Sequence, residues 1–120
     1  MRYLILVGHD EKGGNTLTNE QHAQLFADYQ RYHKDLRQAG LLLAGEPLQP
    51  TTQGARIQVD SGKRRVLDGP FSESKEIIGG FFLIDVKSHA EALEWAARCP
   101  AAHLGQWSYV ELRPVAEIPT

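Results

Sequence analysis

The stretch Gly79-Gly80-Phe81-Phe82-Leu83-Ile84-Asp85-Val86 decides the fold. From Phe81 to Val86 it is apolar on both alternating sets of positions, interrupted only by Asp85, which is the strongest signal for a central strand in this chain. The two glycines precede a strand rather than a helix, so they favour close approach of a neighbouring backbone over phosphate binding. Tyr3 to Val7 is a second unbroken apolar run. The sequence therefore predicts two strands that are each covered on both faces.

Two helices are predicted from their N-terminal capping signals. Thr18 is followed three residues later by Gln21, and Ser88 is followed by Glu91, which is the spacing of a capping box. Gly40 provides a left-handed end for the first helix. That helix carries apolar and aromatic residues in one stripe of 3.6-residue period: Leu25, Phe26, Tyr29, Tyr32, His33 and Leu36.

The remaining segments complete an α+β order. Leu41 to Ala44 predicts a short strand, and Trp107 to Arg113 predicts the last strand. Ala55 to Val59 and Arg65 to Leu67 predict a hairpin around the turn sequence 60–63, Asp-Ser-Gly-Lys. A βαββαβ order with short links implies a ferredoxin-like sandwich with both helices on one face of an antiparallel sheet, and here with an inserted hairpin.

The second face of this sheet lacks a third amphipathic helix to cover it. A second subunit can cover it, so we predict a homodimer formed through the sheet faces. In the last strand, Val110 and Leu112 suit the helix side. The other alternating set would line the space between two sheets, where a small polar ligand can bind: Trp107, Tyr109, Glu111 and Arg113.

Composition predicts one domain over residues 1–120 and excludes several protein classes. The net charge is −2, with acids and bases interspersed, which argues against a nucleic-acid surface. The basic cluster Lys63-Arg64-Arg65 is typical of a solvated strand edge. No apolar stretch is long enough for a signal peptide or a membrane span, and the lone Cys99 excludes an internal disulfide. We expect a cytoplasmic protein without membrane or nucleic-acid partners.

The connection before the central strand is chemically rich. It reads Asp-Gly-Pro-Phe-Ser-Glu-Ser-Lys-Glu over residues 68–76 and carries four ionisable groups. Asp68 is a general base, a hydrogen-bond acceptor for a ligand, or the cap of an Asp-Gly turn. Lys75 either neutralises a ligand anion or pairs with a neighbouring acid, and surface pairs of that kind stabilise little. Phe71 either plugs a core or interface, or lines the ligand site.

These residues give a hypothesis for a functional site. We expect one cleft in which Asp68 or Glu111 moves a proton while Lys75 or Arg113 holds substrate charge. The planar fork of Arg113 suits a carboxylate or an enolate. Tyr109 would form an aromatic wall. The alternative for Arg113 is a simple ion pair with a neighbouring glutamate.

Metal chemistry is not expected from the histidines. The chain has five, and a metal site needs about three converging ligands. His22 and His33 lie eleven residues apart on one helix face, about 16 Å along the axis, so they cannot bind one ion. The sequence therefore predicts no metal and no cofactor.

Several collinear motifs together resemble the YCII-related family, in the subgroup named after its Asp-Gly-Pro-Phe motif. The resemblance implies a dimeric α/β barrel in which two sheets pair. It also implies a small-molecule protein: a cofactor-free lyase or isomerase, or a regulatory or ligand-sensing module linked to an alternative sigma factor. The matching pieces are Met1–Val7, Ala39–Leu41, Gly45–Glu46, Asp68–Phe71, Lys75–Glu76, Gly79–Phe81, Ala92–Ala96 and Glu111–Pro114.

The resemblance also draws attention to two positions that depart from the family pattern. Some YCII-related proteins share a histidine early in the first helix and an aspartate just before the proline that ends the second helix, as a proposed catalytic pair. Alignment on Gly40 puts Tyr29 at the histidine position and Cys99 at the aspartate position. His33 lies one turn further along the helix. This departure argues against the family's acid–base chemistry in this chain.

Overall fold

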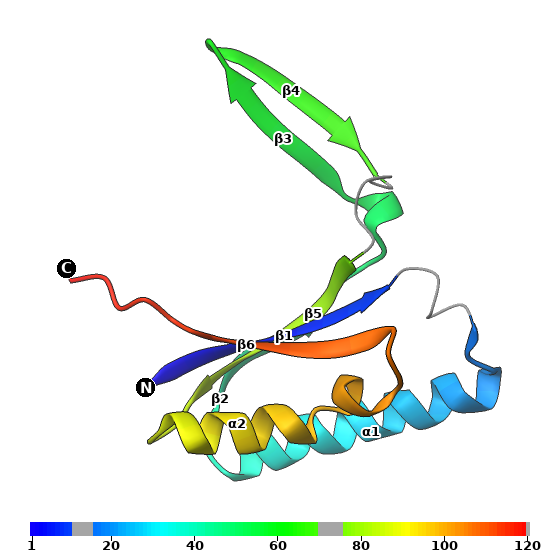
Figure 1. Cartoon of the computed structure of the whole chain (residues 1–120), viewed down its shortest axis with the longest axis vertical. Coiled ribbons are helices and arrows are strands. Elements are labelled where there is room, and N and C mark those ends of the chain that lie inside the picture. Colours follow the sequence, from blue (N-terminus) through cyan, green and yellow to red (C-terminus); the bar gives the residue numbers. More distant parts are fainter. Residues whose placement is uncertain (11–15, 70–75, 120) are drawn as a thin grey trace.

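The computed structural model describes residues 1–10, 16–69 and 76–119. These residues form two α-helices, two short 3-10 helices and six strands in an α+β arrangement (Figure 1). In chain order the elements are β1 (Arg2–Asp10), α1 (Asn19–Gln38), β2 (Leu42–Pro47), η2 (Thr51–Gln53), β3 (Ala55–Asp60), β4 (Lys63–Asp68), β5 (Glu76–Asp85), α2 (His89–Arg98), η3 (Pro100–His103) and β6 (Ser108–Pro114).

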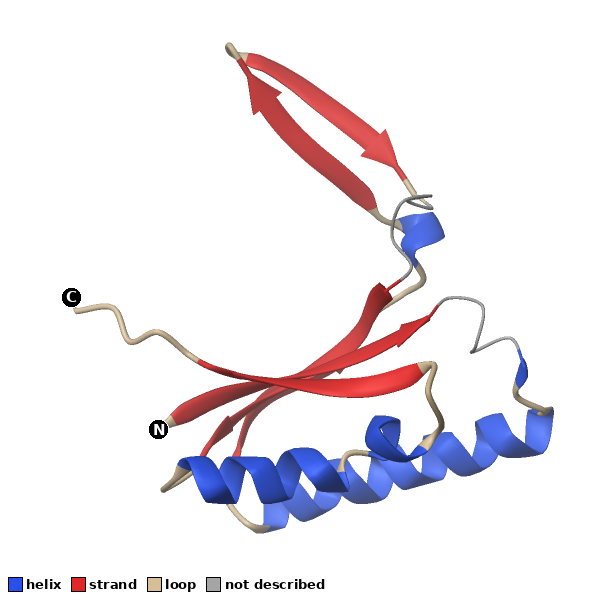
Figure 2. Cartoon of the chain, viewed as in Figure 1, coloured by secondary structure: helices blue, strands red, loops and turns tan. Residues whose placement is uncertain are grey.

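Four strands form the main sheet, in the order β2-β5-β1-β6, and every neighbouring pair is antiparallel. This order is compatible with a ferredoxin-like fold. Both helices cover the same face of the sheet, as Figure 2 shows. The prediction that β5 is a central strand is confirmed, because β5 pairs with β1 on one side and β2 on the other.

The core lies between the helices and one face of this sheet. Ile5 of β1 and Ile84 of β5 are fully buried against Leu36 of α1. Phe82 packs edge-on against Tyr32, with the ring centroids 5.1 Å apart. Such an aromatic pair adds about 0.5–1.5 kcal/mol beyond the area that it buries. Alternate residues of the central strands therefore pack against the helices and hold the sheet to them.

The helix ends follow the predicted capping chemistry. Thr18 accepts a hydrogen bond from the backbone of Gln21, and the Gln21 side chain accepts one from the backbone of Thr18. Ser88 caps α2 in the same way, but the Glu91 carboxylate binds the backbone N–H of Lys87 instead of that of Ser88. Both N-termini are therefore fixed by local sequence.

Strand β1 is longer than the sequence predicted. The predicted strand ends at Val7, but β1 continues to Asp10, with Gly8 opposite Tyr109 and His9 opposite Ser108. A bulge between Val7 and Gly8 adjusts the pairing with β5. The two α-helices lie on one side of β1 only, so the expected cover of its second face stays a prediction that involves a second subunit.

Strands β3 and β4 form a separate two-stranded sheet, the arm, which is inserted between β2 and β5. Its turn uses Ser61 and Gly62 with positive φ angles of 50° and 77°, which is typical of a tight type I′ turn. The arm extends from the body on the side of the main sheet opposite the helices (Figure 1). The predicted hairpin is thus confirmed.

Candidate functional site

The face of the main sheet that points away from the helices, here the free face, carries two rows of side chains. Directly opposite residues of neighbouring strands share a face. Leu4 is paired with both Leu83 and Arg113, and alternation directs all three away from the core. The next row is formed in the same way by Phe81, Leu6 and Glu111. The free face is therefore apolar at its centre and charged along β6.

The predicted division of β6 into two faces agrees with the packing. Val110 and Leu112 pack against the core, as expected. Tyr109, Glu111 and Arg113 therefore lie on the free face by alternation. The sequence thus identified three free-face residues of this edge strand, whereas Trp107, predicted as the fourth, lies before β6.

Tyr109 lies across the neighbouring strand at Gly8. A Cβ added to Gly8 would overlap the phenol ring and lie 2.6 Å from its Oη. Only a residue without a side chain leaves room for the ring here. Gly8 thus leaves room for the Tyr109 ring to lie over β1, next to the row that contains Leu6.

Glu111 and Arg113 meet as an ion pair within β6. Arg113 Nη1 lies 3.4 Å from Glu111 Oε2, and the side chains are 67% and 49% exposed. Such a long, exposed pair stabilises the fold little. The guanidinium is therefore available to an anion on the free face, although the ion-pair alternative for Arg113 is also realised.

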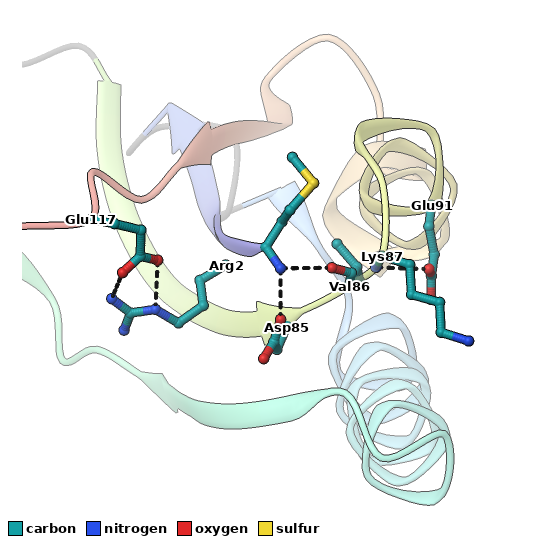
Figure 3. A network of polar contacts seen from close by, with 7 residues as sticks. Arg2, Asp85, Val86, Lys87, Glu91 and Glu117 are labelled. Atoms are coloured by element: carbon teal, nitrogen blue, oxygen red, sulfur yellow. Dashed lines mark hydrogen bonds and ion pairs between the residues drawn. The ribbon is translucent and has the colours of Figure 1, made fainter.

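A second arginine on this face is already engaged. Figure 3 shows Arg2 donating two hydrogen bonds of 2.9 Å to the Glu117 carboxylate. These bonds lower the pKa of Glu117. The N-terminal ammonium donates to Asp85 at 3.0 Å and to the Val86 carbonyl at 2.9 Å (Figure 3). The charges at this end of the sheet are mutually compensated, which distinguishes Arg2 from Arg113.

Asp68 lies on a different sheet from the other predicted site residues. It is the exposed last residue of β4, opposite Ala55. Gly69, which follows it, donates to the Gly54 carbonyl at 3.0 Å and closes the base of the arm. The structure therefore brings Tyr109, Glu111 and Arg113 onto one face and puts Asp68 on the arm. The predicted ligand residues Phe71 and Lys75 lie outside the described residues.

On the helix side, Tyr29 and Cys99 form a pair between α1 and the end of α2. The Tyr29 hydroxyl donates to the Cys99 thiol, and the backbone N–H of Ala101 faces both groups. Burial raises the pKa of Cys99 in spite of these donors. Burial and the neighbouring thiol also raise the pKa of Tyr29. Both groups are therefore neutral at pH 7, and neither is suited to accept a proton.

A groove of about 520 Å³ runs outside this pair, between α1 and η3. Its lining mixes charges of both signs, and the Arg98 guanidinium stacks over the Trp95 ring at 4.5 Å. Because acids and bases alternate, the groove favours no ligand of one charge. The ionisable residues that line it are Asp28, Arg31, Asp35, Arg98 and His103.

His9, near the end of β1, is a further polar group close to the glycine pair of β5. In the structure its Nδ1 is buried and has no hydrogen-bond partner among the described residues. Its Nε2 is 3.1 Å from where a Cβ of Gly79 would lie. The glycine pair was expected before the central strand but lies inside β5. Gly79 leaves space there for the imidazole of His9, whereas the sequence predicted only the close approach of a neighbouring backbone.

Two searches of the described ranges complete the account of the site. Within residues 1–10, 16–69 and 76–119, no three His, Cys, Asp or Glu side chains converge as metal ligands do. In the same ranges, no helix has the length and apolar character to cross a membrane.

Comparison with known proteins identifies the family. The model of the YCII-related domain matches residues 1–116, which include the main sheet, both helices and the arm. The chain belongs to the YCII-related domain family. An uncharacterized protein of Rhizobium meliloti (strain 1021) is 35% identical over 116 residues, covering 97% of this chain and 93% of the relative.

Membership of the YCII-related family gives the Tyr29–Cys99 contact a context. The resemblance placed these two residues where some YCII-related proteins carry a proposed histidine–aspartate pair. The structure brings them into hydrogen-bond contact, although they are far apart in the sequence. Burial raises the pKa of both groups, so the pair is less suited to accept a proton than a histidine–aspartate pair.

Proposed function

We propose that this YCII-related protein binds a small anionic molecule on the free face, within a homodimer that closes over it. The observation that carries the proposal is the exposed guanidinium of Arg113 beside an uncovered apolar row that contains Leu4 and Leu83. An apolar surface with a few convergent polar groups is the usual form of a small-molecule site. The Asp-Gly-Pro-Phe sequence at residues 68–71 further favours membership of the subgroup named after that motif.

The dimer follows from the need to cover the free face. Two copies packed face to face would be about 10 Å apart and would form a dimeric α/β barrel. We expect each copy to bury roughly 800 Å² or more, the size of an ordinary stable interface. The ligand would lie between the sheets, next to β6, where the charged residues of the free face are found.

Three side chains have proposed roles. Arg113 would bind a carboxylate or an enolate through its planar fork, in place of its long contact with Glu111. Tyr109 would provide an aromatic wall. If the bound molecule is turned over, Glu111 would move the proton in a cofactor-free lyase or isomerase reaction. Asp68 and Lys75 could join the site only through the arm and the connection that follows it.

Thermal denaturation with a charged and an uncharged probe tests the proposal. The melting temperature of the wild type is measured with succinate, malonate and the neutral analogue succinamide. We expect the two anions to raise the melting temperature, and succinamide to have no effect. Arg113→Gln should abolish the anion effect.

Arg37→Gln is the matched control, since Arg37 is an exposed arginine in the last turn of α1 on the helix side. The control should respond to succinate and malonate as the wild type does. Equal responses of the two variants, or a wild type that neither anion stabilises, would contradict the proposed binding site.

A further inference from the structure

Within the described residues, the arm formed by β3 and β4 is not part of the main sheet and does not pack in its core. Both strands are exposed at every position, and they pair only with each other. An isolated two-stranded hairpin is marginally stable in water. The Cα radius of gyration is 16.3 Å, whereas a compact domain of this length has about 14 Å. The arm therefore needs a partner surface.

One face of the arm carries more apolar side chains than the other, although Arg64 lies on it opposite Val59 and Leu67 lies on the reverse face. Ile57 and Val66 lie directly opposite each other and are 61% and 54% exposed. Val59, on the same face by alternation, is 68% exposed. The opposite face carries the pair Gln58 and Arg65. An exposed apolar face with a polar reverse side marks an interaction surface.

The charges of the arm and the body are complementary. Residues 55–68 contain four basic and two acidic residues, so the arm carries a net charge of +2. Because the whole chain has a net charge of −2, the remainder carries −4. A second copy of the same chain thus offers an acidic body to a basic arm, which favours association of the two.

The direction of the arm brings it within reach of such a copy. It extends from the side of the main sheet that carries the free face, away from both helices (Figure 2). Six residues per strand give it a length of about 20 Å, twice the spacing of about 10 Å between packed sheets. A second copy on the free face would therefore lie alongside the arm.

We propose that the arm docks its apolar face, formed by Ile57, Val59 and Val66, on a second copy of this chain. The inference rests on the homodimer of the proposed function and adds a second contact region to it. In this arrangement each copy receives the arm of the other, because a two-fold dimer repeats every contact. The interface then has two parts, the paired free faces and the two exchanged arms.

Two double variants of the full chain test which face of the arm contributes to dimerisation. Ile57→Ser with Val66→Ser alters the apolar face, and Gln58→Ser with Arg65→Ser alters the adjacent cross-strand pair on the polar face. Both replace two strand residues by serine, but the first also removes two β-branched residues, so the strand content of each variant is compared by circular dichroism at a concentration where it is monomeric. Light scattering on a size-exclusion column over a dilution series gives the dimer dissociation constant. We expect the first variant to raise it about 30-fold or more, and the second by less than about threefold.

Hydrogen exchange of the wild type provides a measurement that does not depend on the variants. The amides of residues 55–68 should exchange slowly at protein concentrations where the dimer predominates and quickly after dilution to monomer. Equal exchange at both concentrations, equal dissociation constants for the two variants, or a wild type that stays monomeric would overturn the inference.

Leu6→Arg on the free face distinguishes this inference from the proposed function. If Leu6→Arg abolishes the dimer while both arm variants dimerise like the wild type, the arm inference fails and the dimer through the free faces stands. The anion effect at Arg113 is measured separately, by melting temperature, so its failure is recognised independently of the arm.

Discussion

Replacing Gly8 by alanine tests whether the Tyr109 ring is held over β1. The added methyl group would overlap the far end of the ring, which would have to move aside and lose its contacts with β1, and we expect this to cost about 1 kcal/mol. Gly8 does not have a positive φ, so alanine is compatible with its backbone. Without the ring, the same substitution should stabilise by about 0.4–1 kcal/mol, because alanine restricts the unfolded chain more than glycine does.

We therefore predict that the effect of Gly8→Ala on the free energy of unfolding changes sign when Tyr109 is also replaced by alanine. Gly8→Ala should lower the free energy of unfolding in the wild type and raise it in a Tyr109→Ala background. Tyr109→Phe is the matched control, because it keeps the ring and removes only the hydroxyl, so Gly8→Ala should remain destabilising there. Guanidinium unfolding followed by circular dichroism, at one protein concentration for all variants, measures the cycle. If Gly8→Ala changed the free energy of unfolding in the same direction in the wild type, Tyr109→Ala and Tyr109→Phe backgrounds, the placement of the ring would be refuted.

Two further predictions concern the helix side. Phe82→Ala should reduce the free energy of unfolding by about 3–5 kcal/mol in chemical denaturation, whereas Leu93→Ala, at an exposed helix position, should cost about 0.5 kcal/mol or less; similar losses would contradict the assigned core. Because burial raises the pKa of Cys99 above its ordinary value of 9.0, the folded state holds the thiol proton more tightly than the unfolded state. Stability should then be unaffected at pH 7 and fall as the pH rises through 9, and Cys99→Ala should reduce that slope in melts from pH 7 to 10.

The parts of the fold that sequence predicted are those set by local signals. Capping at Thr18 and Ser88, the turn at Gly62 and the two faces of β6 depend on residues within a few positions of one another. They could be read without knowledge of the tertiary structure. The antiparallel sheet with both helices on one face followed from the order of the elements and their short links.

The site was predictable only in part, because it depends on the placement of distant segments. Sequence could assign Glu111 and Arg113 to one face of a strand, and the structure agrees. It could not fix the direction in which the arm leaves the body, so Asp68 was expected beside residues from which the arm separates it in the single chain. The sequence pointed to Tyr29 and Cys99 only because they align with two positions of the family pattern. It did not predict their contact, since nothing in the local sequence reveals a contact between two helices.

The hydrogen-bonded junction at the base of the arm limits how the length of the arm can vary among relatives. Gly69 is bonded to the Gly54 carbonyl, and a Cβ on Gly69 would overlap the backbone of Thr51, so this junction tolerates little change. Beyond it, residues can be added or removed without disturbing the register of the main sheet. One additional residue in each of β3 and β4 would direct the apolar side chains to the opposite side of the arm, and two additional residues in each strand would restore their direction. Arm length should therefore vary in increments of four residues, each changing the reach by about 7 Å.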